Sequence, residues 1–386
     1  MAAVITRIRE VAVVRHNNRT DWILFGTMLA LSGFGLLMIY SATRNTGTFS
    51  MERQMIFVAA GLIIFLIFSN IDYREYRSII PAAAGVIMVL LIVVFFFETN
   101  NVSRWIPLGY FKLQPAEFAK VVVIVGLASM LAPPASRDEL LVPRSLTWAK
   151  MGQAAALVAV PGYMILREPD LGTAMVFGFL LFALLFLAGA SWRQMLALIS
   201  LTVVGIIAVF RFELLNTYQM NRIRVLFDQT IEPQGIGYQL RQSKSAIGSG
   251  QLFGKGLFAE GSFTDFQYVP EQENDFIFTA VAEQLGFVGG VLVLAAFAII
   301  VWRLFVIAVN ARDRFGALVA AGIGAMVMCH VFINVGMTMG IMPVTGLPLP
   351  LLSQGGSFFM SMALALGIAN SIWLLRTPVP GENQLT

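Results

Sequence analysis

The feature that most constrains this chain is a series of long apolar runs separated by short polar connections. A run of about 17 to 25 apolar residues can cross the hydrocarbon core of a bilayer as a helix. Lipid offers the backbone no hydrogen-bond partners, so a spanning segment must be a helix or belong to a closed barrel. Barrel strands alternate in polarity, and these runs do not. The sequence therefore predicts an all-α, polytopic membrane protein.

The composition excludes several other classes of protein. Only 12% of the residues are charged, against roughly 25% in soluble domains. A single cysteine, Cys329, rules out an intrachain disulfide and a thiolate metal cluster. The two histidines, His16 and His330, lack the close spacing of a zinc site. We interpret the net charge of +4 as a mark of membrane orientation and not of nucleic-acid binding.

We predict one membrane domain over residues 1–386 with about ten spans. Lys and Arg in the short connections favour the side of the two termini by two to one, which places residues 1–20 and 376–386 in the cytoplasm. Residues 1–20 lack the apolar core of a signal peptide, so the first run is expected to remain as a span. The spans are expected near residues 22–43, 54–70, 79–97, 117–132, 148–166, 171–189, 194–213, 276–302, 315–338 and 354–375.

The connection over residues 214–275, between helices seven and eight, is far longer than ordinary loops. Its aromatic residues and glycines differ from the charged, low-complexity composition of disorder. We expect an ordered extracytoplasmic loop packed on the outer face. Within it, QSKSAIGSGQLFGKG places Lys244 and Lys255 among glycines, which permits phosphate binding, although a flexible turn is the simpler interpretation.

Ionisable residues at membrane depth usually mark function. Asp275 opens the eighth span, and Glu283 follows eight residues later, roughly on the same helical face. An alternative is that Asp275 is the N-cap of this helix. In the fourth span, Glu117 and Lys120 are spaced to pair on one face, and a purely structural ion pair is the simpler alternative. Arg104, beside a tryptophan, also fits an interfacial anchor.

The segment from about residue 334 to 357 contains prolines and glycines that break helix between the last two spans. Irregular backbone at that depth is tolerated where it is buried in protein or lines a polar cavity. We therefore expect a cavity there.

Five stretches together resemble the SEDS family (shape, elongation, division and sporulation), and they occur in the family's order. The QSK and GKGLF stretches of the long loop are more similar to the elongation (RodA) branch than to the division (FtsW) branch. The matching stretches are RWIPLGYFKLQPAEFAK, REPDLGTAM, NRIRVLFDQTIEPQGIGYQLRQSKSAIGSGQLFGKGLF, PEQENDFIFTAVAEQLG and MPVTGLPLPLLSQGGS.

The resemblance implies a peptidoglycan glycosyltransferase of the bacterial cytoplasmic membrane. Such an enzyme polymerises lipid II at the outer face, releases polyprenyl diphosphate and works with a class B penicillin-binding protein. The family's essential aspartate matches Asp275, which we expect to act as the base or as a ligand of a divalent cation such as Mg or Mn. Expected substrate-binding residues are Arg53, Arg104, Glu117, Lys120, Lys244 and Glu283.

The chain departs from the family pattern at four positions. Ala116 stands where Ser is usual, Glu273 and Asn274 replace His-Thr, and Gln284 replaces a second Glu. We expect the extra acid at Glu273 to raise the pKa of Asp275 by repulsion. Two other functions fit a polytopic protein with a polar cavity, namely a flippase for the lipid-linked precursor and a noncatalytic scaffold for a transpeptidase.

Overall fold

The computed structural model describes residues 20–45, 50–97, 104–109, 111–132, 146–212, 215–232 and 234–376. The predicted terminal segments 1–20 and 376–386 therefore lie outside the described residues, apart from Thr20 and Arg376. Each of the ten predicted spans is a helix. These helices are α2 (Trp22–Thr43), α3 (Ser50–Asn70), α4 (Tyr76–Val94), α5 (Pro115–Leu131), α6 (Trp148–Arg167), α7 (Leu171–Leu187), α8 (Trp192–Arg211), α11 (Ile277–Asn310), α12 (Arg314–Thr338) and α13 (Gly356–Leu374).

Among the described residues, eight of these helices are long and apolar enough to cross a membrane. The exceptions are α5 and α7, which have 17 residues each, and α5 also carries Glu117 and Lys120. A 3₁₀ helix over Tyr73–Glu75 leads into α4, and a small antiparallel hairpin of β1 (Ile106–Pro107) and β2 (Lys112–Leu113) leads into α5. The chain is an α-helical membrane protein, as predicted.

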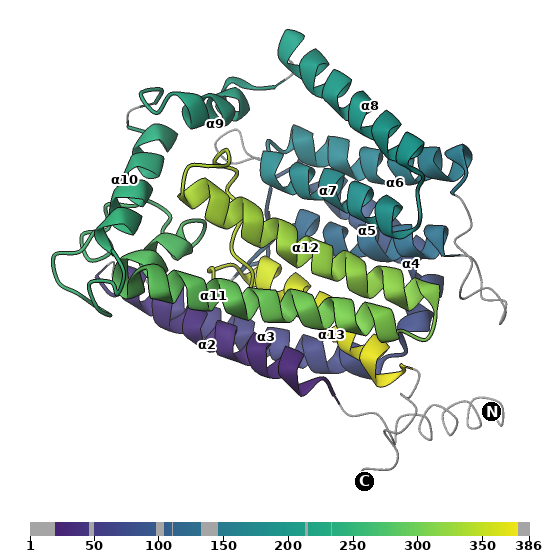
Figure 1. Cartoon of the computed structure of the whole chain (residues 1–386), viewed down its shortest axis with the longest axis horizontal. Helices are drawn as coiled ribbons and strands as arrows, with labels where there is room; N and C mark the ends of the chain where they lie inside the picture. The colour runs from purple at the N-terminus through teal and green to yellow at the C-terminus, as the bar shows by residue number, and fades with distance from the viewer. Residues whose placement is uncertain are drawn as a thin grey trace.

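The bundle is built around α12 and α13, whose surfaces are mostly buried. Helix α12 packs against α5, α7, α11 and α13, while α3 packs along α13 and α2 along α11 (Figure 1). Only 17% of the spanning window is buried in each of helices α3, α4 and α8, as is typical of helices at the lipid boundary. Helix α8 diverges from the bundle toward its C-terminal end, and its buried residues lie only in its first two turns.

Ion pairs and hydrogen bonds fix the two ends of the bundle. Asp21, before α2, accepts a hydrogen bond of 2.7 Å from Arg303 of α11, and its amide donates to Asn370 of α13. At the opposite end, Arg44 pairs with Asp265 of the long connection at 2.8 Å. The first and last described residues thus lie opposite the long connection. We call the end with this connection the loop end.

The long connection is ordered, as predicted, and it contains two helices, α9 (Thr217–Phe227) and α10 (Ile236–Ser249). Helix α10 lies across the loop end against α11 and α12 (Figure 1). The interpretation of QSKSAIGSGQLFGKG as a flexible turn is wrong for residues 242–250, which form the last turns of α10 and its cap, while residues 251–256 form turns.

Helix α11 is interrupted at Gly286, where φ is 66° and ψ is −162°. Residues 251–256 supply the missing partners: Lys255 and Gly256 amides donate to the carbonyls of Glu283 and Gln284, and the Phe287 and Val288 amides donate to the carbonyls of Gln251 and Leu252. The backbone groups at the break are therefore hydrogen-bonded. In an isolated kink they would face lipid, which offers no hydrogen-bond partners.

Glycine is required at this contact because two backbones touch. A Cβ atom at Gly254 would lie 2.1 Å from the carbonyl oxygen of Gln284, and its φ of +78° also favours glycine. Glu283 strengthens the same attachment, since its carboxylate pairs with Lys255 at 2.8 Å and accepts hydrogen bonds from the Phe263 and Thr264 amides. The loop is thus held on α11 by backbone and side chain together.

We predict that Gly254→Ala destabilises the protein, because the added methyl group forces the two backbones apart. The measurement is the thermal midpoint of the detergent-purified protein, which should fall by several degrees. Gly248→Ala is the matched control, because a Cβ at that helical glycine meets nothing within 4 Å and alanine favours helix. Equal midpoints for the two variants would contradict the assigned contact.

Candidate functional site

A polar cavity of about 640 Å³ lies at the loop end. The hairpin before α5, helices α9 and α10, residues 271–276 and the irregular segment between α12 and α13 all contribute to its wall. The prediction of a cavity at the proline- and glycine-rich segment is therefore confirmed. Its charged lining residues are Arg104, Lys112, Glu117, Asp170, Arg222, Glu232, Glu271 and Asp275.

Asp275 lies on this wall, just before α11. The N-cap alternative is wrong, because Phe276 occupies the cap position and no side-chain hydrogen bond caps the helix. The backbone of Asp275 is fixed from two sides: its amide donates to the carbonyl of Glu271 at 3.1 Å, and its carbonyl accepts from Asn334 Nδ2 at 2.8 Å. Asn334 also donates to the carbonyl of Leu347 at 2.7 Å.

Burial raises the pKa of Asp275 to about 6. The positive charges of Arg222 and Arg104 lower this pKa, but the effect of burial is larger. The acids that add to the rise are Glu271 and Asp170. The predicted repulsion from Glu273 is therefore not the cause. A carboxyl group with a pKa near neutrality can exchange a proton under physiological conditions.

Arg222 of α9 is a site residue that sequence reasoning missed. It donates to the carbonyl of Thr345 and to the hydroxyl of Tyr218, and its guanidinium lies 4.6 Å from the Tyr218 ring centroid. A Cβ atom at Gly346 would lie 3.1 Å from Arg222 Nη1 and 3.2 Å from Asp275 Oδ2. The arginine and the acid therefore flank this glycine.

Arg104 reaches the cavity from the connection before α5. Its Nε donates to the carbonyl of Glu168 at 3.1 Å, and Nη2 donates to the carbonyl of Pro169. Asp170, on the same turn, caps α7 through the Thr173 amide at 3.0 Å. Burial, reinforced by Asp170, raises the pKa of Glu168 to about 9, so that side chain is neutral at pH 7. Arg104 is thus held by backbone carbonyls at the edge of the cavity.

Glu117 and Lys120 form the predicted ion pair, 2.6 Å apart, and both are almost completely buried. Glu117 lines the cavity, whereas Lys120 lies behind it and beneath the ring of Phe358, 5.1 Å from the centroid. The predicted ion pair is therefore present, and it contributes to the cavity wall through Glu117.

Besides Lys120, three predicted substrate-binding residues are not among the cavity-lining residues. Arg53 is exposed on α3, and Lys244 is exposed on α10 beside Gly340. Glu283 holds the loop and does not share the wall with Asp275. A substrate role for each stays a prediction.

The positions that depart from the family pattern have local roles. Ala116 is fully buried, Asn274 donates to the Glu271 carboxylate at 2.6 Å, and Gln284 accepts a hydrogen bond from Ser41 at 2.8 Å. The part of the chain that the structure describes contains no group of three or more His, Cys, Asp or Glu side chains that could hold a metal ion.

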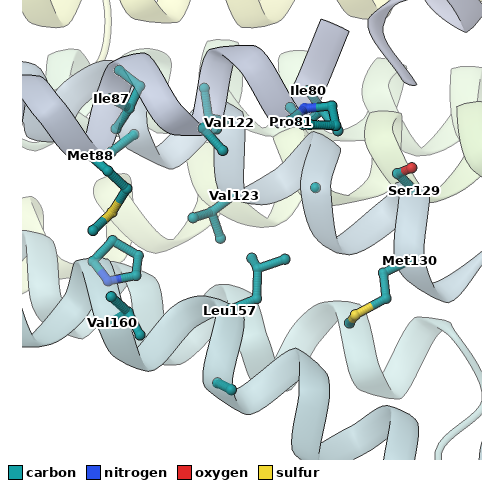
Figure 2. Close-up of a pocket in the computed structure, with 15 residues that line it drawn as sticks. Ile80, Pro81, Ile87, Met88, Val122, Val123, Ser129, Met130, Leu157 and Val160 are labelled. Carbon is teal, nitrogen blue, oxygen red and sulfur yellow. The ribbon is translucent and has the colours of Figure 1, made fainter. Parts of the chain in front are cut away.

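A second cavity, of about 440 Å³, lies on another face of α5, between α4 and α6 (Figure 2). Its lining is apolar apart from Ser129 and includes Met88, Val122, Leu157 and Val160. This cavity fits hydrocarbon and not a charged group.

The chain belongs to the family of cell cycle proteins that includes FtsW, RodA and SpoVE, because the family model matches residues 21–376. It is 36% identical to the peptidoglycan glycosyltransferase MrdB of Escherichia coli K12, over 89% of this chain and 91% of that protein. It is 34% identical to the stage V sporulation protein E of Bacillus subtilis, over 90% and 95%.

Solved structures agree with this assignment. A chain from a peptidoglycan synthase complex that coordinates polymerization and crosslinking matches with a TM-score of 0.75 and 27% identity, over 92% of this chain and 98% of that one. The rod shape determining protein RodA of Thermus thermophilus matches with a TM-score of 0.67 and 26% identity, over 94% and 99%. The fold predicted from the sequence is confirmed.

We predict that Asp275→Asn raises thermal stability at neutral pH. The carboxyl pKa is 3.8 in the reference state and about 6 in the folded protein. Between these values the unfolded chain loses its proton first, so stability falls as pH rises through this window. The stability gained by the variant over the wild type should therefore be absent near pH 4, increase between pH 4 and about pH 6, and stay constant at higher pH.

The measurement is the thermal midpoint of each purified protein across this pH range. Glu260→Gln, which neutralises an exposed carboxylate, is the control and should show no such gain. A gain for Asp275→Asn that is the same at every pH would contradict the assignment.

Proposed function

We propose that this protein is a peptidoglycan glycosyltransferase that polymerises lipid II into glycan strands. The observation that carries the proposal is the Asp275 carboxyl group in a polar cavity that also contains Arg104 and Arg222. An acid with a raised pKa beside fixed cations suits a reaction that removes a proton and expels a diphosphate. The names of the relatives, above all MrdB, support the same activity.

Asp275 acts as the base in this proposal. It takes the proton from a sugar hydroxyl, the hydroxyl oxygen bonds to the anomeric carbon, and the bond from that carbon to the diphosphate breaks with inversion. Arg104, Arg222 and Lys112 line the cavity and offer positive charge to the leaving diphosphate. Arginine favours this role because its planar donors bind phosphate in a bidentate manner.

The same proposal includes the orientation of the enzyme in the membrane and its protein partner. The loop end faces outward from the bacterial cytoplasmic membrane, both termini are cytoplasmic, and the polyprenyl chains of lipid II and its diphosphate product stay in the lipid. A class B penicillin-binding protein is the proposed partner, supported by the similarity to a chain of a peptidoglycan synthase complex. The similarity to MrdB and RodA favours a role in elongation and rod shape.

Two alternatives make different predictions. A flippase should carry its charged binding site near the middle of the bilayer, whereas the cavity described here lies at the loop end. A flippase would also move precursor without forming polymer. A noncatalytic scaffold would retain its function when Asp275 loses its charge.

We predict that Asp275→Asn abolishes polymer formation from lipid II, because asparagine cannot accept the hydroxyl proton. Glycan strands made by the purified protein with its partner are separated by length on gels. Loss of a general base typically lowers the rate by about 100-fold or more. Glu260→Gln is the control and should polymerise normally. An Asp275→Asn protein with an undiminished rate would remove this residue from the chemistry.

As an alternative to the base role, we propose that Asp275 serves as a ligand of a divalent cation, Mg or Mn. Such ions are often held by one or two carboxylates together with substrate phosphates, and Asp275 is the carboxylate that would serve. The ion would supply positive charge to the diphosphate. We predict that a chelator stops polymerisation and that added Mg or Mn restores it. Full activity in the chelator would exclude the cation.

A further inference from the structure

Behind the cavity wall, three buried side chains form a continuous chain of polar contacts. Glu117 Oε2 lies 2.6 Å from Lys120 Nζ, and Lys120 Nζ lies 2.9 Å from His330 Nε2. His330 Nδ1 in turn lies 2.8 Å from the carbonyl oxygen of Met326. His330 and Lys120 are both completely enclosed, at 0% and 1% exposure. Only the Glu117 end of this chain is part of the cavity wall.

The hydrogen-bond geometry fixes the state of the imidazole. A carbonyl oxygen only accepts, so His330 Nδ1 must carry the hydrogen. The Lys120 ammonium only donates, so His330 Nε2 must offer its lone pair. The ring is therefore neutral. The Lys120 ammonium thus lies between the Glu117 carboxylate, 2.6 Å away, and the lone pair of His330 Nε2, 2.9 Å away.

We propose that His330 and Lys120 are positioning residues that act through Glu117, and that Glu117 is the member of this chain that contacts the substrate. The proposal rests on the proposed function and refines it, because the sequence predicted that Lys120 binds the substrate directly. Its burial behind Glu117 and Phe358 places it out of the cavity lining. A carboxylate held by a fixed cation is a directed acceptor for a hydroxyl or amide hydrogen of the substrate.

Helix α12 connects this chain to Asp275. His330 and Asn334 are four residues apart and so lie on one face of the helix. The Asn334 side chain donates a hydrogen bond to the backbone carbonyl of Asp275. His330 accepts a hydrogen bond from the Lys120 ammonium. One face of α12 therefore positions both Glu117 and Asp275.

The test uses His330→Leu and His330→Gln, which leave the Glu117–Lys120 ion pair in place. Leucine offers no acceptor, whereas the Gln side-chain oxygen can accept the ammonium hydrogen. Cys329→Ala, a change at the buried neighbour, is the packing control. The measurements are the Kd for labelled lipid II and the KM and kcat of polymerisation, on protein that elutes as a single species and has a cooperative thermal transition.

We expect His330→Leu to raise Kd and KM about tenfold, the scale of a lost charge-assisted hydrogen bond, with a smaller change in kcat. His330→Gln and Cys329→Ala should bind nearly as the wild type does. In a Glu117→Gln background, His330→Leu should add no further loss, because the two residues act as a unit.

A wild-type Kd for folded His330→Leu would overturn the proposal, as would equal losses in His330→Gln and His330→Leu or additive losses with Glu117→Gln. If the wild type binds lipid II but forms no polymer, the proposed function fails, and the Kd values still decide the role of His330. If the wild type does not bind lipid II, both proposals fail.

Discussion

The interruption of α11 at Gly286 is the constraint on which the loop end depends. An apolar helix gains nothing from breaking inside a membrane unless other backbone groups replace the lost hydrogen bonds. Residues 251–256 do so, and they can approach only because Gly254 has no side chain. The long connection is therefore attached to the helix that begins directly after Asp275. The geometry of the cavity follows from this attachment, since α10 and residues 271–276 both form part of its wall.

Several charged side chains of the bundle form ion pairs, whereas Asp275 does not form one with any described residue. Arg303 pairs with Asp21, Lys120 with Glu117, and Lys255 with Glu283. Breaking such a pair by removing one partner is strongly destabilising. The Asp21 and Glu283 pairs attach the start of α2 and the long connection to α11, and the Glu117 pair lies within α5. Asp275 has no ion pair within the described part of the chain, and its burial raises its pKa. This cost to stability is typical of a residue kept for chemistry.

The spans could be predicted because lipid imposes length and apolarity on every helix that crosses it. The extension of α11 to Asn310 was missed, since the end of a long apolar helix depends on its packing beyond the membrane core. Within the site, Arg104, Glu117 and Asp275 were found because they stand in recognisable stretches at span ends. Arg222 was missed although Gln219, Arg222 and Val225 are buried at a spacing of three, the signal of a helical face.

Other parts of the site could not be read from the sequence. The link between Lys120 and His330 joins residues 210 positions apart, and no local pattern reports such a contact. Likewise, Glu283 stands in the same sequence stretch as Asp275. Because α11 is interrupted at Gly286 and the loop packs there, the Glu283 carboxylate binds the loop and not the cavity. Arg53 and Lys244 have the charge expected of a phosphate ligand, and only their place on the outer faces of α3 and α10 separates them from the cavity.

The shortness of α5 and α7 has a consequence for where polar groups can lie. A helix of 17 residues is about 25 Å long, roughly 5 Å shorter than the hydrocarbon core. These two helices pack against each other, and the first turn of each contributes to the polar cavity. Most residues of α5 are buried in the bundle, so its neighbours and not lipid enclose it. A helix enclosed in this way can be shorter than the bilayer is thick without turning unpaired backbone groups toward hydrocarbon.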